Sequence, residues 1–243
     1  MTGVQTCALP ISGRKPASVA APAAAPAADT AGPNRWPSQV TVRDQGQRNR
    51  IDIAEDLQGP LSIVIHGDDN LVRIGPGCRS QNLRIDVRGH HCEIVVGERC
   101  VLAGEFTQRD PRTRLQVGDQ TTMMGSKITM HEAGLIRIGT DCMFAGEVRM
   151  DTSDMHSILD ADTGARLNPP GDIEIGDHVW LGFGTYVLKG VSIGANSVIG
   201  ACAVVAQDIP EGSLAVGMPA RVVRERVTWD RRRLGPDGQP RRD

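Results

Sequence analysis

Apolar residues recur at every sixth position in the last third of the chain. An aliphatic residue, in most cases followed by a small one, stands at each of Ile175, Leu181, Val187, Ile193, Ile199 and Val205. A second row follows four positions after each, at Val179, Thr185, Val191, Ser197, Ala203 and Ile209. Six is three times the two-residue period of a strand, so these side chains share one face of a strand. A helical period of 3.6 would scatter them. The pattern therefore predicts short β-strands.

A longer repeat of 18 to 22 residues lies over the short one. Its coil starts are predicted at Ile53, Ile74, Val96, Val117, Ile138, His156, Ile175 and Ile193. Three strands of six residues make a coil of 18, and three extra residues at one corner make 21. We therefore predict an all-β fold over residues 38–226, a triangular solenoid whose parallel coils stack about 4.8 Å apart.

Small residues fill defined positions of this repeat. Cys78, Cys100, Thr121 and Cys142 each lie four residues after a coil start, which predicts an inward column of small side chains. The six cysteines include no CxxC pair, which argues against a zinc ribbon or a disulfide scaffold. We therefore expect no metal and a reducing, cytoplasmic environment.

Composition excludes two classes of partner. The 243 residues carry a net charge of -2, so no basic field favours nucleic acid. No uncharged apolar run approaches the roughly 18 residues of a membrane span.

The two ends differ from the repeat. Residues 1–11 resemble translated sequencing-adapter sequence, and residues 12–37 are rich in Ala and Pro, which is typical of a disordered linker. Residues 227–243 mix Arg, Gly and Pro and are expected to form a flexible tail.

One histidine stands where the repeat fails. His156 falls at an expected coil start, and residues 157–171 abandon the six-residue pattern and contain a Pro pair. This stretch predicts a protruding loop. An imidazole beside such a break is placed to remove a proton at neutral pH.

Several sequence motifs in the chain resemble those of a known protein family. They are residues 150–156 (MDTSDMH), 177–182 (DHVWLG), 193–201 (IGANSVIGA), 208–210 (DIP) and 217–221 (GMPAR). With them the chain resembles the hexapeptide-repeat acyltransferases, most closely the sugar and polysaccharide O-acetyltransferases. In that branch a catalytic His lies 24 residues before a Trp, as His156 and Trp180 do here. The resemblance covers most of residues 50–226 and implies a left-handed parallel β-helix, although parallel crossovers are generally right-handed.

The resemblance also implies a reaction. Acetyl-CoA would donate an acetyl group directly to a hydroxyl of a sugar or glycan, with His156 as general base. Asp154, Asp151 and Glu132 are the candidate carboxylates for orienting the imidazole, and the sequence does not rank them. The backbone amide of Phe183 would stabilise the oxyanion.

Donor binding follows from the same resemblance. Phe183 and Ala201 would flank the pantetheine arm, Trp180 would line the cleft, and Arg221 and Arg224 would reach the CoA phosphates. Two positions depart from the family: Phe183 stands where a small residue, often Ser, is common, and Gln207 stands where Lys is common. A homotrimer is implied, with His156 of one subunit facing Trp180 or the C-terminal arginines of the next.

Three other functions compete with this one. An amine of an amino sugar, amino acid or antibiotic could replace the hydroxyl as acceptor. A γ-type carbonic anhydrase shares the fold but needs three His ligands, and its compact His-x4-His motif does not occur here. A non-catalytic scaffold leaves the interruption at His156 unexplained.

Overall fold

The computed structural model describes residues 36–241, which contain strands and no helix. The predictions for residues 1–11 and for the linker up to residue 35 lie outside this part. The strands are β1 (Val40–Asp44), β2 (Arg50–Ile53), β3 (Leu61–Ile65), β4 (Leu71–Ile74), β5 (Arg79–Ser80), β6 (Leu83–Val87), β7 (Glu93–Val96), β8 (Val101–Gln108), β9 (Thr113–Val117), β10 (Thr122–Met130), β11 (Gly134–Ile138), β12 (Met143–Phe144), β13 (Arg149–Asp151), β14 (Ile173–Ile175), β15 (Trp180–Leu181), β16 (Tyr186–Val187), β17 (Ser192–Ile193), β18 (Val198–Ile199), β19 (Val204–Val205), β20 (Ser213–Val216) and β21 (Arg221–Glu225).

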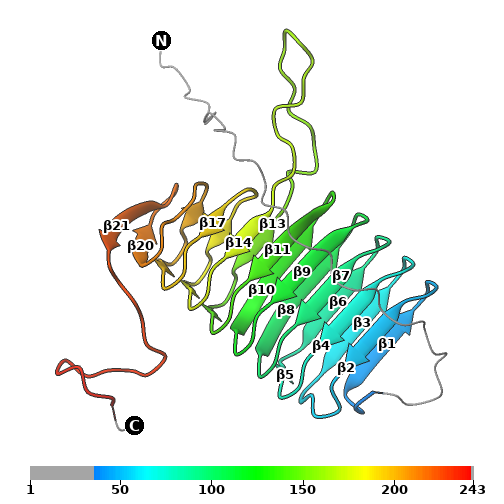
Figure 1. Cartoon of the computed structure of the whole chain (residues 1–243), viewed down its shortest axis with the longest axis horizontal. Coiled ribbons are helices and arrows are strands. Elements are labelled where there is room, and N and C mark those ends of the chain that lie inside the picture. The colour runs from blue at the N-terminus through cyan, green and yellow to red at the C-terminus, as the bar shows by residue number, and fades with distance from the viewer. Residues whose placement is uncertain (1–35, 242–243) are drawn as a thin grey trace, which may run out of the picture. The chain divides into compact units, whose positions relative to one another are not determined.

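These strands stack as the parallel coils of a left-handed β-helix (Figure 1). One face is the sheet β17-β14-β11-β9-β7-β4-β2. The larger sheet supplies the other two faces: β12, β15 and β18 form one, and β13, β16 and β19 form the other. The long strand β10 joins them because it pairs with both β12 and β13. The predicted all-β solenoid is confirmed.

Strand register confirms most of the predicted coil starts and corrects one. Ile53 pairs with Ile74, which pairs with Val96, and the ladder continues coil by coil. Ile138 then pairs directly with Ile175. The prediction that His156 starts a coil is therefore wrong. The chain leaves the solenoid after β13 and returns at β14, so the residues between them are an insertion.

The interior consists of ladders of buried side chains. Cys78, Cys100, Thr121 and Cys142 are all buried and form the predicted column. Their polar atoms are satisfied between coils: the Thr121 hydroxyl donates to Gly139 O at 2.9 Å and accepts from the Cys142 amide at 3.0 Å. Burial raises the pKa of the Cys142 thiol to about 11. The column is therefore structural.

Glycine after the aliphatic residue is required by close packing of successive coils. A Cβ on Gly139 would lie 2.6 Å from the carbonyl carbon of Gly176, and one on Gly176 would lie 2.6 Å from the amide nitrogen of Ala195. Backbone atoms cannot move away from such a contact. The small residue of each pair thus sets how closely the coils approach.

Two features depart from regular coils. The loop of residues 157–171 projects from the solenoid as predicted (Figure 1), and Leu159 and Arg166 form an antiparallel bridge across it. At the C-terminal end, β20 and β21 form an antiparallel pair. At the other end, Trp36 packs against the core. Residues 36–241 contain no helix of the length and hydropathy needed to cross a membrane.

Candidate active site

His156 lies at the base of the projecting loop with its side chain exposed. Its backbone is held at both ends: its amide donates to Asp154 O at 2.7 Å, and its carbonyl accepts from Asn168 Nδ2 at 2.8 Å. The imidazole makes no hydrogen bond to another described residue. The ring is therefore free to meet a ligand, while its backbone is fixed.

Asn168 organises the neck of the loop. It is buried, and Nδ2 also donates to Asp154 at 2.7 Å while Oδ1 accepts from the Ile158 amide at 2.6 Å. Lys189, on the following coil, donates a hydrogen bond from Nζ to Asn168 O at 3.1 Å. Sequence reasoning missed this residue, although its place in the Asn-Pro-Pro-Gly turn that ends the loop is a signal for it.

Two of the three candidate carboxylates anchor this loop. Although partial burial opposes ionisation, hydrogen bonds from Lys189 and Asn168 hold the pKa of Asp154 below its usual value. Glu132 accepts both guanidinium nitrogens of Arg166, at 2.6 and 2.8 Å, and the Ser153 hydroxyl at 2.5 Å. The Arg166 and Ser153 hydrogen bonds lower the pKa of Glu132 to about 2.

The third carboxylate points elsewhere. Asp151 accepts the Tyr186 hydroxyl at 2.6 Å. Burial and this hydrogen bond raise the pKa of Tyr186 to about 12. Within one copy of the described chain, the structure thus brings none of the three candidates into contact with the His156 imidazole.

Phe183 and Ala201 are brought together at one corner of the solenoid. They lie on successive coils, where the Cys202 amide donates to Phe183 O at 2.7 Å. The Gly182 and Gly184 amides donate to backbone carbonyls, whereas those of Phe183 and Ala201 donate to no described residue. The Phe183 ring is 55% exposed. This corner therefore offers two free N–H donors beside an accessible apolar ring.

The C-terminal arginines lie on β21, whose residues are all exposed. A hollow of about 540 Å³ runs along residues 222–226. Arg221 donates to Ala220 O at 2.9 Å, and the Arg224 guanidinium makes no ion pair with a described residue. These two cations are accessible to an anionic ligand.

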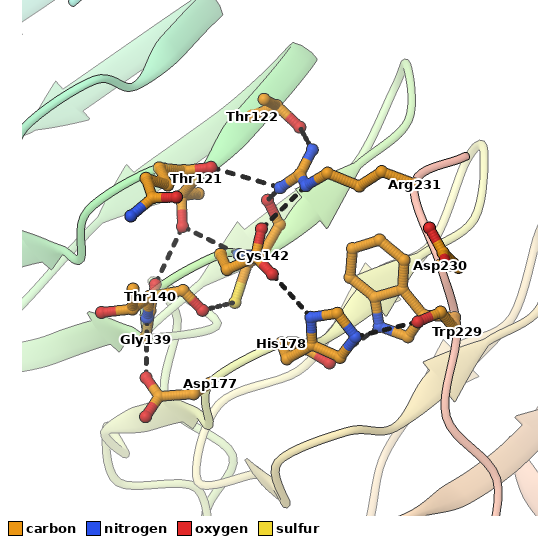
Figure 2. Close-up of polar contacts among 12 residues, drawn as sticks. Thr121, Thr122, Gly139, Thr140, Cys142, Asp177, His178, Trp229, Asp230 and Arg231 are labelled. Carbon is orange, nitrogen blue, oxygen red and sulfur yellow. Dashed lines mark hydrogen bonds and ion pairs between the residues drawn. The ribbon is translucent and has the colours of Figure 1, made fainter. Parts of the chain in front are cut away.

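Trp180 begins β15, and its neighbour in space is unexpected. The side chain is 38% exposed and meets Trp229 at a tilted centroid distance of 6.2 Å. Trp229 in turn stacks on His178 at 4.1 Å and donates its indole N–H to His178 O at 2.7 Å (Figure 2). The sequence analysis placed Trp229 in a flexible tail, but the structure holds this part of it.

Arg231 completes this attachment, which we call the C-terminal strap (residues 227–233). It donates to Asp141 Oδ1 at 2.8 Å, to the Thr122 hydroxyl at 3.0 Å and to the carbonyls of Gln120 and Cys142 (Figure 2). His178 Nδ1 lies 2.7 Å from Asp141 as well. The strap thus crosses the coils next to Trp180, and no periodicity in the sequence signals it.

His156 and Trp180 lie at opposite ends of one solenoid face. His156 lies in the insertion that precedes β14, and Trp180 begins the strand that follows β14. A face of five or six residues is roughly 17 Å wide. One copy of the chain therefore keeps the two residues apart.

A second hollow, of about 440 Å³, lies on the outer face of β8, β10 and β13 and reaches Arg88, which follows β6. Its lining includes Thr107, Arg109, Lys127, Thr129, His131, Arg149 and Met155. Burial lowers the pKa of His131, which favours its neutral imidazole. Sequence reasoning missed this hollow, although its cations are about one coil apart in the chain. Within residues 36–241, no group of three His, Cys, Asp or Glu side chains is arranged to hold a metal.

Comparison with known proteins gives a consistent family. Residues 172–207 match the family described as Bacterial transferase hexapeptide (six repeats). The polysialic acid O-acetyltransferase of Neisseria meningitidis is 33% identical over 148 residues, which are 60% of this chain and 69% of that protein. The galactoside O-acetyltransferase of Lactococcus lactis subsp. lactis is 34% identical over 131 residues, 54% of this chain and 62% of that protein.

The solved structure of the polysialic acid O-acetyltransferase OatWY extends the likeness to the whole solenoid. It superposes with a TM-score of 0.76 and 31% identity, covering 81% of this chain and 94% of that one. The chain accordingly belongs to the hexapeptide-repeat acyltransferases and is an acyltransferase of the left-handed β-helix type.

Proposed function

We propose that this protein transfers an acetyl group from acetyl-CoA to a hydroxyl of a sugar, with His156 as the general base. Acetyltransferase names among the relatives support the acyl group and the sugar class of acceptor. The observation that carries the residue assignment is the exposed His156 ring on a backbone fixed by Asn168.

The reaction proceeds in one direct transfer. A neutral imidazole nitrogen of His156 takes the acceptor O–H proton as the oxygen attacks the thioester carbonyl. The resulting oxyanion accepts a hydrogen bond from the free Phe183 amide. The tetrahedral intermediate then collapses. The C–S bond breaks, the new C–O ester bond remains, and the departing CoA thiolate takes the proton from the imidazolium.

The donor would bind on the late coils and at the C-terminal end of the solenoid. The free Ala201 amide and the exposed Phe183 ring suit the amide-bearing pantetheine arm, and the accessible guanidinium groups of Arg221 and Arg224 suit the CoA phosphates. Trp180 lines the cleft beside the Trp229 ring.

The complete site needs more than one copy of the chain. A face of the solenoid separates His156 from Trp180 within one copy, so a second copy must supply the missing half. The loop carries the exposed apolar side chains of Ile158, Leu159 and Leu167, which a neighbouring subunit would cover. A homotrimer with His156 facing Trp180 of the next subunit satisfies both requirements.

Replacement of His156 by Ala tests the proposal. We expect kcat to fall about 10³-fold, the typical contribution of a general base, with little change in the Kd for acetyl-CoA. His66→Ala is the matched control, since it removes a half-exposed imidazole from an early coil and should leave kcat unchanged. Full activity of His156→Ala, measured as CoA thiol release with a sugar acceptor, would reject the assignment.

A further inference from the structure

The hollow on β8, β10 and β13 has more cations than carboxylates in its lining. Lys127 and Arg149 are paired residues of adjacent strands, so their side chains lie next to each other. Arg109 lies across the hollow from them. None of the three forms an ion pair with a described residue. These cations are therefore available to a ligand.

The lining holds fewer carboxylates than cations: Glu105 and Asp151 accompany Arg88, Arg109, Lys127 and Arg149. Glu105 is the cross-strand neighbour of Lys127 but forms no ion pair with it, and it is in contact with the Thr107 hydroxyl at 3.4 Å. Asp151 accepts the Tyr186 hydroxyl at 2.6 Å. The fourth cation, Arg88, is already paired with Asp86 at 2.7 Å. A ligand that brings its own carboxylate would meet unpaired positive charge.

The hollow presents hydroxyl side chains between charged ones. Lys127 lies on β10 and His131 directly follows this strand, four residues and roughly 13 Å further along. Thr129 lies between them, and Thr107 pairs with it on the next strand, so two hydroxyl side chains form the floor. Hydroxyls flanked by cations offer hydrogen bonds for sugar hydroxyls and charge for an acidic substituent.

The hollow also reaches the proposed catalytic base. Met155 lines it, and His156 is the next residue, about 3.8 Å away between Cα atoms. A sugar in the hollow would therefore lie beside the segment that carries the imidazole.

We propose that this hollow is the acceptor subsite and that it takes a carboxylate-bearing sugar unit, held by Arg109, Lys127 and Arg149. This rests on the proposed function and narrows its acceptor. The relatives named above act on a charged polymer in one case and on a galactoside in the other, so their names do not choose between an acidic and a neutral sugar. The unpaired cations in the hollow of this chain favour an acidic sugar.

The experiment measures binding without any donor present, so it does not depend on turnover. The probes are a sialic acid polymer and the same polymer with its carboxylates reduced to alcohols. The test variant is Lys127→Gln/Arg149→Gln. Its matched control is Arg114→Gln/Arg137→Gln, which removes two exposed cations, also without ion pairs to described residues, from β9 and β11 on another face.

We expect the test variant to bind the acidic polymer about tenfold or more weakly, as loss of charge-assisted hydrogen bonds predicts, and the control to bind as the unaltered protein does. The reduced polymer should bind the unaltered protein as weakly as the acidic polymer binds the variant. Unchanged binding in the variant, equal binding of both polymers, or no binding of the acidic polymer would overturn the subsite. So would a change of oligomeric state with glycan binding preserved, because the face would then be a contact between copies.

Turnover separates this inference from the proposed function. If CoA release proceeds with a neutral sugar and depends on His156 while the acidic polymer fails to bind, the acidic subsite is wrong and the acetyltransferase proposal stands. If the polymer binds through Lys127 and Arg149 but no sugar accepts an acetyl group, the subsite stands and the transferase proposal fails.

Discussion

The coils that contain β8 and β10 are built differently from the coils after the loop. Before it, β8 and β10 are eight and nine residues long, and each runs across the corner between two faces. After it, β15, β16 and β18 have two residues each, and the corners interrupt the hydrogen-bonded ladder. The long strands make a broad outer face with rows of side chains, whereas the short strands leave corner amides such as that of Phe183 free.

This difference divides the proposed binding tasks between the two regions. Rows of side chains one coil apart can recognise an acceptor, as Lys127 and Arg149 are positioned to do. Free backbone donors suit the amides of a pantetheine arm and a developing oxyanion. The insertion that carries His156 lies between the two regions, which is where a general base for transfer from one ligand to the other must be.

An Asn-to-Ala substitution should have different effects in the loop and in an early coil. Asn168→Ala removes the hydrogen bonds that fix the backbone of His156 and Ile158, so we expect kcat to fall about 100-fold. The KM for acetyl-CoA should change little, because the donor residues lie elsewhere. Asn70→Ala, in an early coil, removes an equally buried amide that accepts from the Cys92 amide, and should lower stability but leave kcat unchanged.

Steady-state kinetics and thermal unfolding of both variants check this contrast. Asn168→Asp keeps the acceptor for the Ile158 amide but loses the donor to His156, so it should recover only part of kcat. Equal losses of kcat in the Asn70 and Asn168 variants would mean that the loop neck has no special role in positioning the base.

The regular coils were predictable from the sequence because their physical cause is local and repeated. A close approach such as that of Gly176 to Ala195 recurs at each turn, and the buried Cys and Thr column follows the same spacing. The prediction of a coil start at His156 failed because the insertion is nearly as long as one coil and therefore preserves the spacing. Register between Ile138 and Ile175 depends on hydrogen bonds that spacing alone does not fix.

The candidate site was predictable only in part. Phe183 and Ala201 are neighbours because they occupy equal positions in successive coils. The bonds of Glu132 to Arg166 and of Arg231 to Asp141 join segments with no periodic relation, so the sequence does not indicate them. They depend on how an insertion and a tail settle on the solenoid surface.

Acid should release the loop before it affects the early coils. Because Arg166 and Ser153 lower the pKa of Glu132 to about 2, its contribution to loop attachment is complete above the ordinary value near 4.5 and is lost as the pH falls towards 2. The protection factors of residues 157–167, which correct for the slower intrinsic exchange of amides in acid, should therefore fall several-fold over this interval, and less in β3 and β6. In Glu132→Gln the exchange should be fast already at pH 6, and a loop that stays protected in that variant would contradict the assignment.

The smallest contrast concerns two arginines at the surface. Arg231 donates to a carboxylate, a hydroxyl and two carbonyls from two successive coils, whereas Arg48 in an early coil pairs only with Asp69. Arg231→Gln should therefore lower the free energy of unfolding by about 1–2 kcal/mol, and Arg48→Gln should produce no measurable change, as exposed pairs generally do. Urea unfolding of both variants measures the difference, and acetyl-CoA KM gives a second readout for Arg231→Gln. A strap that only stabilises the coils would leave KM unchanged, whereas one that holds Trp229 against Trp180 would raise it. If both arginine variants unfold like the original protein, the strap does not contribute to the stability of the late coils.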